Sequence, residues 1–257
     1  MTSAAFDAYT GRLSLAASAD DRILGVVLLG SGADASRIDE WSDHDIALIV
    51  RGDAVADVRA STDWLPDGER LVAVGREWHD GFKAVFDDGR VVEYAVTDVT
   101  GLATFPLAAA RVVLDRGGVS DAVAGAIAST RTRLVSAPEA LAAALLVHLL
   151  VGVGRLRRGE RLSAGNVIRS EAALSFIDLW LAVCHPGESH PDPFDGRRRI
   201  ERVDPEVAGR LDDAMEQSTE RAARSILSLA EEIIAPAWPG WPGSGADAVR
   251  RRLGWST

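Results

Sequence analysis

Two aspartates separated by one residue begin an apolar run in the N-terminal part of the chain. Asp43 and Asp45 flank His44 and precede Ile46–Val50. Side chains alternate along a β-strand, so we expect the two carboxylates on one face and His44 on the other. His44 is therefore expected to pack inside the protein. The paired carboxylates can hold a hard divalent cation such as Mg²⁺ against bound phosphates.

A second apolar run and a small turn precede the aspartates. Ile23–Leu29 leads into Gly30 and Ser31, and eleven residues then separate Ser31 from Asp43. A continuous apolar run is typical of a strand covered on both faces. The backbone N–H groups of such a turn form an anion-binding concavity, and glycine permits close approach. We expect Gly30 and Ser31 to bind the phosphates of a triphosphate. Arg37 in the spacer either contacts phosphate or faces solvent.

These elements occur in a fixed order: a strand, the Gly30-Ser31 turn, a spacer, and a second strand that begins with Asp43 and Asp45. This order resembles the signature of the nucleotidyltransferase superfamily, which has the DNA polymerase β-like fold. Each part alone is common, whereas the ordered combination is fairly specific. The resemblance covers residues 22–98 and is loose thereafter. It implies a nucleoside triphosphate donor, two Mg²⁺ ions and a further acid on a later strand. The alternative is a surface hairpin with scattered acids.

Glu93, within the predicted strand Val91–Val96, is the best match to the further acid that the resemblance implies. Two ions about 4 Å apart can clamp the attacking and leaving oxygens of a phosphoryl group, which usually requires another carboxylate. The resemblance implies that Glu93 completes a metal site with Asp43 and Asp45 or acts as general base. Glu93 facing solvent from an edge strand and Asp98 as the further acid are the alternatives.

Composition narrows the classes of partner. The chain has 257 residues, a hydrophobic content of 47%, a formal net charge of -10 and a pI of about 5.0. Nucleic-acid-binding proteins usually carry a basic patch, and none is evident in the N-terminal half, so we expect no nucleic-acid partner. The acidic balance favours a cationic one. Lys83 is the only lysine, and the single Cys184 excludes an internal disulfide.

The chain shows no sign of membrane targeting. The first residues lack the basic start and apolar core of a signal peptide. The most apolar run, Leu141–Val153, spans 13 residues, and a membrane span needs about 20. We therefore expect a buried helix at Leu141–Val153 in a cytoplasmic protein with no membrane partner.

Residue patterns predict an α+β protein with two domains. Strand and turn signals, including a hairpin around Asp87–Arg90, extend to about residue 118, and helical periodicity follows. We expect a nucleotidyltransferase core with a mixed sheet at residues 1–118 and an α-helical domain at 119–257. The expected helices lie at 119–134, 138–157, 164–184, 205–216, 218–234 and 246–253. The proline- and glycine-rich stretch 235–245 is expected to be non-helical.

The two-domain layout resembles the aminoglycoside and lincosamide nucleotidyltransferases. The resemblance implies Mg²⁺-dependent transfer of a nucleoside monophosphate to a hydroxyl of a small-molecule acceptor, with release of pyrophosphate and a role in antibiotic resistance. AMP from ATP is the expected group, with another nucleoside triphosphate as the alternative donor. In those enzymes the helical domain closes over the nucleotide, so Glu171 would bind an acceptor amine or serve as base. A solvated helix face is the alternative for Glu171.

Two other functions keep the same fold. The acceptor is a protein in AMP-transferring modules of the toxin–antitoxin type, although antitoxin-type nucleotidyltransferases lack so large a helical domain. A non-catalytic nucleotide-binding module is the other alternative, which retention of Gly30, Ser31, Asp43 and Asp45 disfavours. The sequence leaves the acceptor, the nucleotide preference and the oligomeric state open.

Overall fold

A computed structural model describes residues 3–77, 80–133, 137–187, 192 and 195–255 of the chain. The chain forms two compact units, Met1–Arg133 and Leu134–Thr257. The first unit contains a six-stranded mixed sheet with helices, and the second is helical. The predicted α+β class is therefore confirmed.

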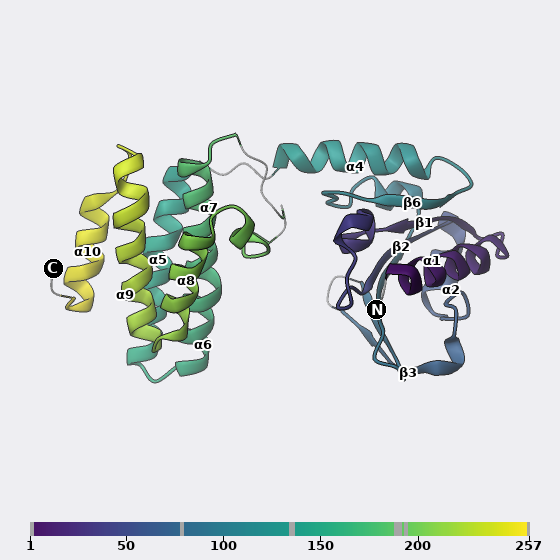
Figure 1. The fold of residues 1–257 in the computed structure, drawn as a ribbon, viewed down its shortest axis with the longest axis horizontal. Helices are drawn as coiled ribbons and strands as arrows, with labels where there is room; N and C mark the ends of the chain where they lie inside the picture. The colour runs from purple at the N-terminus through teal and green to yellow at the C-terminus, as the bar shows by residue number, and fades with distance from the viewer. Residues whose placement is uncertain (1–2, 78–79, 134–136, 188–191, 193–194, 256–257) are drawn as a thin grey trace. The chain divides into compact units, whose positions relative to one another are not determined.

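The sheet of the first unit has the strand order β3-β4-β5-β2-β1-β6. Figure 1 labels β1, β2, β3 and β6 of this sheet. Strands β2 and β5 are parallel, and the other neighbours are antiparallel. The strands are β1 (Ile23–Leu28), β2 (His44–Val50), β3 (Leu71–Arg76), β4 (Phe82–Phe86), β5 (Val91–Thr97) and β6 (Arg111–Asp115). The helices of this unit are α1 (Ser3–Ser18), α2 (Val55–Arg59), α3 (Val99–Leu102) and α4 (Val119–Arg133). The parallel pairing brings the starts of β2 and β5 side by side.

Alternation along β2 sorts the core into two layers. Ile46 and Leu48 lie in an apolar cluster with residues of α1, whereas Ala47 and Ile49 lie in another with residues of α3 and α4. Both faces of β2 are therefore covered, which explains its continuous apolar sequence. Asp45 has the same parity as Ala47 and Ile49, so its side chain begins the face that α3 and α4 cover farther along the strand.

Helix α4 belongs to the first unit. Its residues Val119, Val123 and Ala126 are buried in the cluster that covers this face of β1 and β2. The two compact units consequently divide after Arg133, whereas the sequence placed the domain boundary after Gly118, where helical periodicity begins. Periodicity indicates the type of element but not which core that element joins.

The second unit has one apolar core surrounded by helices. These are α5 (Pro138–Arg157), α6 (Arg161–Asn166), α7 (Ala173–Cys184), α8 (Pro205–Glu216), α9 (Thr219–Leu229) and α10 (Gly243–Leu253). Wider π-type turns at Val167–Ala172 and Ala230–Ile234 join α6 to α7 and extend α9. The predicted helix at 164–184 is therefore helical throughout, and the one predicted at 218–234 is helical from Thr219 onward.

Helix α10 begins earlier than expected. The stretch 235–245 was predicted to be non-helical, which is wrong at both ends, because Ala235–Ala237 form a 3-10 turn and α10 starts at Gly243. Burial of Ala246, Val249 and Leu253 in the core of the second unit stabilises this helix. Packing of an apolar face outweighs the low helix propensity of glycine in the first turn.

Among the described residues, α5 is the one helix long and apolar enough to cross a membrane, judged by length and composition. The core helix of a folded domain meets the same criteria. Leu145, Leu149 and Val153 of α5 are buried in the core of the second unit, as expected for this run. The opposite side of α5 exposes Val147 and Val151.

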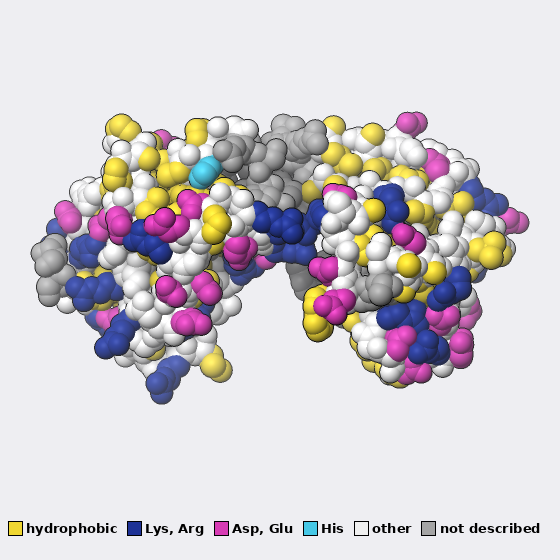
Figure 2. All heavy atoms as spheres, in the orientation of Figure 1, with side chains coloured by type: hydrophobic (Ala, Val, Ile, Leu, Met, Phe, Trp, Pro, Cys, Tyr) yellow, Lys and Arg dark blue, Asp and Glu magenta, His cyan; other side chains and the backbone are white. Residues whose placement is uncertain are grey.

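Acidic and basic side chains are interspersed over the visible surface of the first unit (Figure 2). Many of them form ion pairs, including Arg12 with Asp67 and Arg70 with Asp87. Exposed pairs of this kind contribute about 0–1 kcal/mol each to stability. Their main consequence here is that they neutralise the arginines around the site described next.

Candidate active site

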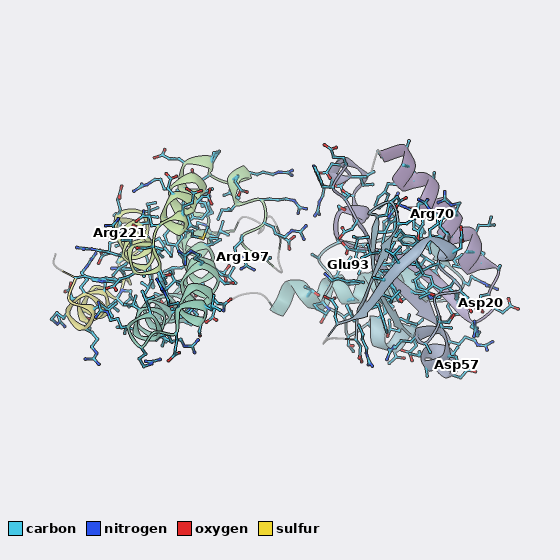
Figure 3. The ribbon with its side chains drawn as sticks, turned by 90° about the horizontal axis from the view of Figure 1, so that it is seen from below. Asp20, Asp57, Arg70, Glu93, Arg197 and Arg221 are labelled. Carbon is cyan, nitrogen blue, oxygen red and sulfur yellow. The ribbon has the colours of Figure 1, made fainter. Side chains whose placement is uncertain are left out.

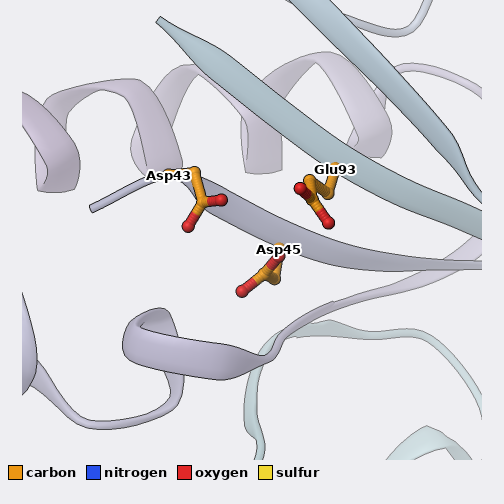
Figure 4. Close-up of side chains that lie close together, drawn as sticks. All are labelled: Asp43, Asp45 and Glu93. Carbon is orange, nitrogen blue, oxygen red and sulfur yellow. The ribbon is translucent and has the colours of Figure 1, made fainter. Parts of the chain in front are cut away.

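Three carboxylates meet where β2 and β5 begin. Asp45 lies opposite Glu93 in the parallel pair, and Asp43 directly precedes β2. Each residue offers one carboxylate oxygen, and these oxygens lie within 4.8 Å of one another. Figure 3 places Glu93 in the first unit, and Figure 4 shows the three carboxylates facing a common space. The structure thus brings together the three acids that the sequence selected.

The donor set fits a hard divalent cation. All three groups supply oxygen, the ligand that Mg²⁺ prefers, and all three residues are half-buried. Carboxylates this close repel each other, and a bound cation would relieve that repulsion. Asp43, Asp45 and Glu93 are therefore the residues that would hold the ion.

The Gly30-Ser31 turn packs directly against one of these acids. Gly30 has a φ of +53°, and a Cβ added there would lie 1.9 Å from Oδ2 of Asp45. The N–H of Leu29 also donates to the backbone oxygen of Asp45 at 2.9 Å. The hydroxyl of Ser31 is buried and has no hydrogen-bond partner among the described residues. A buried hydroxyl without a partner is unusual, and a phosphate oxygen would satisfy it.

Two arginines present buried N–H groups in or beside the turn region. Nε of Arg37 is buried and makes no hydrogen bond within the described part of the chain. Arg111, at the start of β6, donates from Nε to the backbone oxygen of Gly32 at 3.1 Å, and its Nη2 atom is buried without such a bond. The sequence identified Arg37 and missed Arg111. The signal for Arg111 was a charged residue heading an apolar strand.

His44 points away from the acids, as expected. It is buried, and its ring stacks on Phe6 at a centroid distance of 3.7 Å. Its Nε2 atom lies 3.2 Å from Oγ1 of Thr10 and 3.3 Å from the backbone oxygen of Phe6. Burial lowers the pKa of His44 from 6.5 to about 4. His44 is therefore a neutral packing residue at physiological pH.

This burial predicts that stability falls in mild acid. The unfolded chain binds a proton at His44 below pH 6.5, whereas the folded protein binds it only near pH 4. The stabilisation is therefore complete above pH 6.5 and decreases by up to about 3 kcal/mol as the pH falls toward 4. Urea unfolding across this range should show a smaller decrease for His44→Phe, which keeps the ring stacking. Identical pH dependence in the two proteins would contradict the assignment.

A cavity of about 800 Å³ adjoins the acid cluster. Asp43 and Glu93 form part of its wall, and the rest comes from α1, the segments before β2 and β3, and the β4–β5 turn with the start of β5. Trp41, which is 86% exposed, lines it and offers an apolar ring for stacking. Tyr9 also lines the cavity, and its hydroxyl is buried with no hydrogen-bond partner within the described residues. The volume suits a ligand of drug size.

The cavity wall is acidic overall. Five acids and three arginines line it. The arginines are neutralised locally, because Arg12 and Arg90 both bond to Asp67 while Arg70 and Arg90 pair with Asp88. The excess of acids favours a cationic ligand.

Lys83 on β4 contacts the third acid. Its Nζ atom lies 2.5 Å from Oε1 of Glu93. The sequence recognised Lys83 as the only lysine but missed this contact. The hairpin turn Asp87–Arg90 was the signal, because it aligns Lys83 with Glu93 across the two strands.

The other selected residues lie elsewhere. Asp98 accepts a hydrogen bond from the N–H of Gly101 at 2.7 Å and caps α3, so it acts as a helix cap. Glu171 belongs to the second unit, where it accepts a bond from Asn166 at 3.1 Å and lies 3.7 Å from Nε2 of His148. Its predicted role in acceptor binding stays a prediction.

The sequence and the structure were each compared with known proteins. Neither protein-family models nor curated proteins match the sequence. Comparison of structures finds an aminoglycoside 6-adenyltransferase from Bacillus subtilis, with 13% identity and a TM-score of 0.30, covering 96% of this chain and 91% of that chain. It also finds a nucleotidyltransferase-like protein from Exiguobacterium sibiricum 255-15, with 13% identity and a TM-score of 0.37, covering 96% and 80%. Both TM-scores are low, so these similarities say nothing about the chemistry of the site.

Proposed function

We propose that this protein is a metal-dependent nucleotidyltransferase that moves AMP from ATP to a hydroxyl of a small-molecule acceptor and releases pyrophosphate. The observation that supports it is the convergence of Asp43, Asp45 and Glu93 beside the turn that contains Gly30 and Ser31. Transfer of a nucleotidyl group to a hydroxyl requires ligands for a cation and hydrogen-bond donors to phosphate in one site.

The donor nucleotide occupies the turn side of the acids. Backbone N–H groups around Gly30 and the buried hydroxyl of Ser31 receive its phosphates. Asp43, Asp45 and Glu93 would hold two Mg²⁺ ions. When bound, these ions supply positive charge that stabilises the transferred phosphoryl group and lowers the pKa of the acceptor hydroxyl.

The acceptor occupies the cavity, where its hydroxyl reaches the same acids. Its oxygen forms a bond to the α-phosphorus as the bond from that phosphorus to the β-bridging oxygen breaks. Pyrophosphate leaves with the electron pair. The hydroxyl proton passes to a carboxylate, for which Glu93 and Asp43 are suited because both line the cavity.

The charge of the cavity narrows the acceptor class. Asp43 and Glu93 would hold the metal ions, so Glu40 and the exposed ring of Trp41 are the wall groups that suit a hydroxylated ring that carries amino groups. An aminoglycoside has this chemistry. Modification of an aminoglycoside in the cytoplasm would confer resistance to it.

Pyrophosphate release tests this function. Purified protein with Mg²⁺ and each of the four nucleoside triphosphates is assayed against a panel of aminoglycosides and lincosamides. We expect release that requires both ATP and an aminoglycoside. Silence across the panel, with a melting temperature that Mg²⁺-ATP still raises, would favour a protein or another metabolite as acceptor. No release and no effect of Mg²⁺-ATP on melting would refute the nucleotide site.

A further inference from the structure

A lysine continues the row of charged residues that crosses the sheet at the candidate site. The strand register places Asp45 opposite Glu93, Glu93 opposite Lys83 and Lys83 opposite Gly75. Residues directly opposite one another on neighbouring strands share a face of the sheet. Two acids, the only lysine of the chain and a glycine therefore form one line across β2, β5, β4 and β3.

The ammonium group of Lys83 lies between two carboxylates. Its Nζ atom is 2.5 Å from Oε1 of Glu93 and 3.4 Å from Oε1 of Glu77, which follows β3. The hydrogen bond to Glu93 raises the pKa of Lys83, so the group stays charged at neutral pH. Charge-assisted hydrogen bonds of this kind are among the stronger ones.

The same carboxylate is needed by a metal ion. An ammonium and a divalent cation compete for Glu93, because both are attracted to its oxygens and repel each other. Glu77 gives the ammonium a second partner. Gly75 leaves the intervening surface open, since a Cβ added there would meet no atom within 4 Å in the described structure. The lysine can therefore leave Glu93 without losing its counter-charge.

We propose that Lys83 is an internal competitor for the metal site, which neutralises Glu93 in the metal-free protein and transfers to Glu77 when a divalent ion binds. This inference rests on the proposed metal site and assigns to Lys83 and Glu77 the control of its affinity. The free protein then binds metal weakly. The phosphates of an incoming nucleotide supply the additional ligands that favour the metal-bound state.

Mn²⁺ binding to the nucleotide-free protein tests the competition. Calorimetric titration should show that Lys83→Met raises the affinity about tenfold, at the lower end of the range typical of groups adjoining metal ligands. Glu77→Gln should lower it by less, about threefold, because Glu77 acts only through Lys83. In the Lys83→Met background, Glu77→Gln should change the affinity less than about twofold, because the ammonium that links the two acids is gone. Charges acting independently would give equal effects of Glu77→Gln in both backgrounds.

A matched variant controls for net charge. Arg76→Met also removes one positive charge from the β3–β4 hairpin, but its side chain has the opposite parity to Gly75 and pairs with Asp80. It should leave Mn²⁺ affinity within about twofold of the wild type, since it adjoins none of the proposed ligands. An increase equal to that of Lys83→Met would refute competition at Glu93.

The movement of Lys83 can also be followed by NMR, because it is the only lysine in the chain. Protein labelled with [13Cε]lysine has one lysine Cε resonance, that of Lys83. Saturating Mg²⁺ should shift this resonance in the wild type and leave it unchanged in Asp45→Asn, which lacks a ligand. If calorimetry detects metal binding but Mg²⁺ leaves the chemical shift of this resonance unchanged, the transfer to Glu77 is refuted.

The failures of this inference and of the metal site are distinguishable. If the wild type binds no Mn²⁺ at the acids, the metal site and the role of Lys83 both fail. If binding depends on Asp45 but is unchanged by Lys83→Met, the metal site stands and the role of Lys83 alone is refuted.

Discussion

Asp45→Asn should reduce nucleotidyl transfer at least about a thousandfold, equivalent to about 4 kcal/mol of transition-state stabilisation. Asp45 is central to the carboxylate cluster, because it lies opposite Glu93 and touches the turn at Gly30. The amide keeps the shape of the side chain but lacks the negative charge that attracts a divalent ion. Pyrophosphate release under saturating acceptor, ATP and Mg²⁺ measures the effect.

Asp98→Asn is the matched control for this substitution. It makes the same chemical change at the other acid that the sequence offered. Asp98 caps α3, and asparagine caps a helix about as well as aspartate. Turnover should therefore stay within about twofold of the wild type, since a cap that is retained costs little. Equal losses in the two variants would show that the cluster has no special role.

The stability of Asp45→Asn separates loss of chemistry from loss of structure. Three carboxylates whose oxygens lie within 4.8 Å repel one another without metal. The variant should melt at the same temperature as the metal-free wild type or higher, because its backbone bond to Leu29 is retained. A folded variant with normal turnover would refute the metal-binding role of Asp45.

The carboxylate cluster could be predicted because two of its three acids are placed by their spacing within one strand. Alternation along one strand places Asp43 and Asp45 on one face and His44 on the other, as the structure shows. The position of Glu93 required one further condition, the pairing of β2 with β5. These strands are not consecutive in the chain, so the resemblance, and not the spacing, supplied that condition.

The sequence pattern did not predict contacts between segments that lie far apart in the chain. Arg111 bonds to Gly32 from 79 residues away, and nothing in either segment specifies the other. The cavity likewise combines α1, the segment at Trp41 and the β4–β5 turn. The pattern also left open which unit contains helix α4, because helical periodicity does not reveal which apolar surface a helix covers.

Gly30→Ala should reduce transfer at least about a hundredfold, equivalent to about 2.7 kcal/mol, although it replaces no charged or hydroxyl group. The residue has a positive φ, and an added Cβ would lie 1.9 Å from Oδ2 of Asp45. Either the turn or the carboxylate must move, which displaces the phosphate donors from the metal ligands. Small misplacements of reacting groups reduce rates by about a hundredfold.

Gly118→Ala isolates the steric effect from the backbone effect. Gly118 also has a positive φ, at +74°, but a Cβ there would have no atom of the described structure within 4 Å. Both variants lose about 1–2 kcal/mol of stability from left-handed backbone strain. Gly30→Ala should lose more, because its Cβ also overlaps Oδ2 of Asp45, so its melting temperature should fall further than that of Gly118→Ala. Only Gly30→Ala should lose turnover, and its Mn²⁺ affinity should weaken as Asp45 is displaced. Equal activity in the two variants at a temperature where both are folded would show that contact between the turn and Asp45 does not position the site. Loss confined to Gly30→Ala would show that the glycine is required because the phosphate-binding turn and the metal ligand occupy adjoining space.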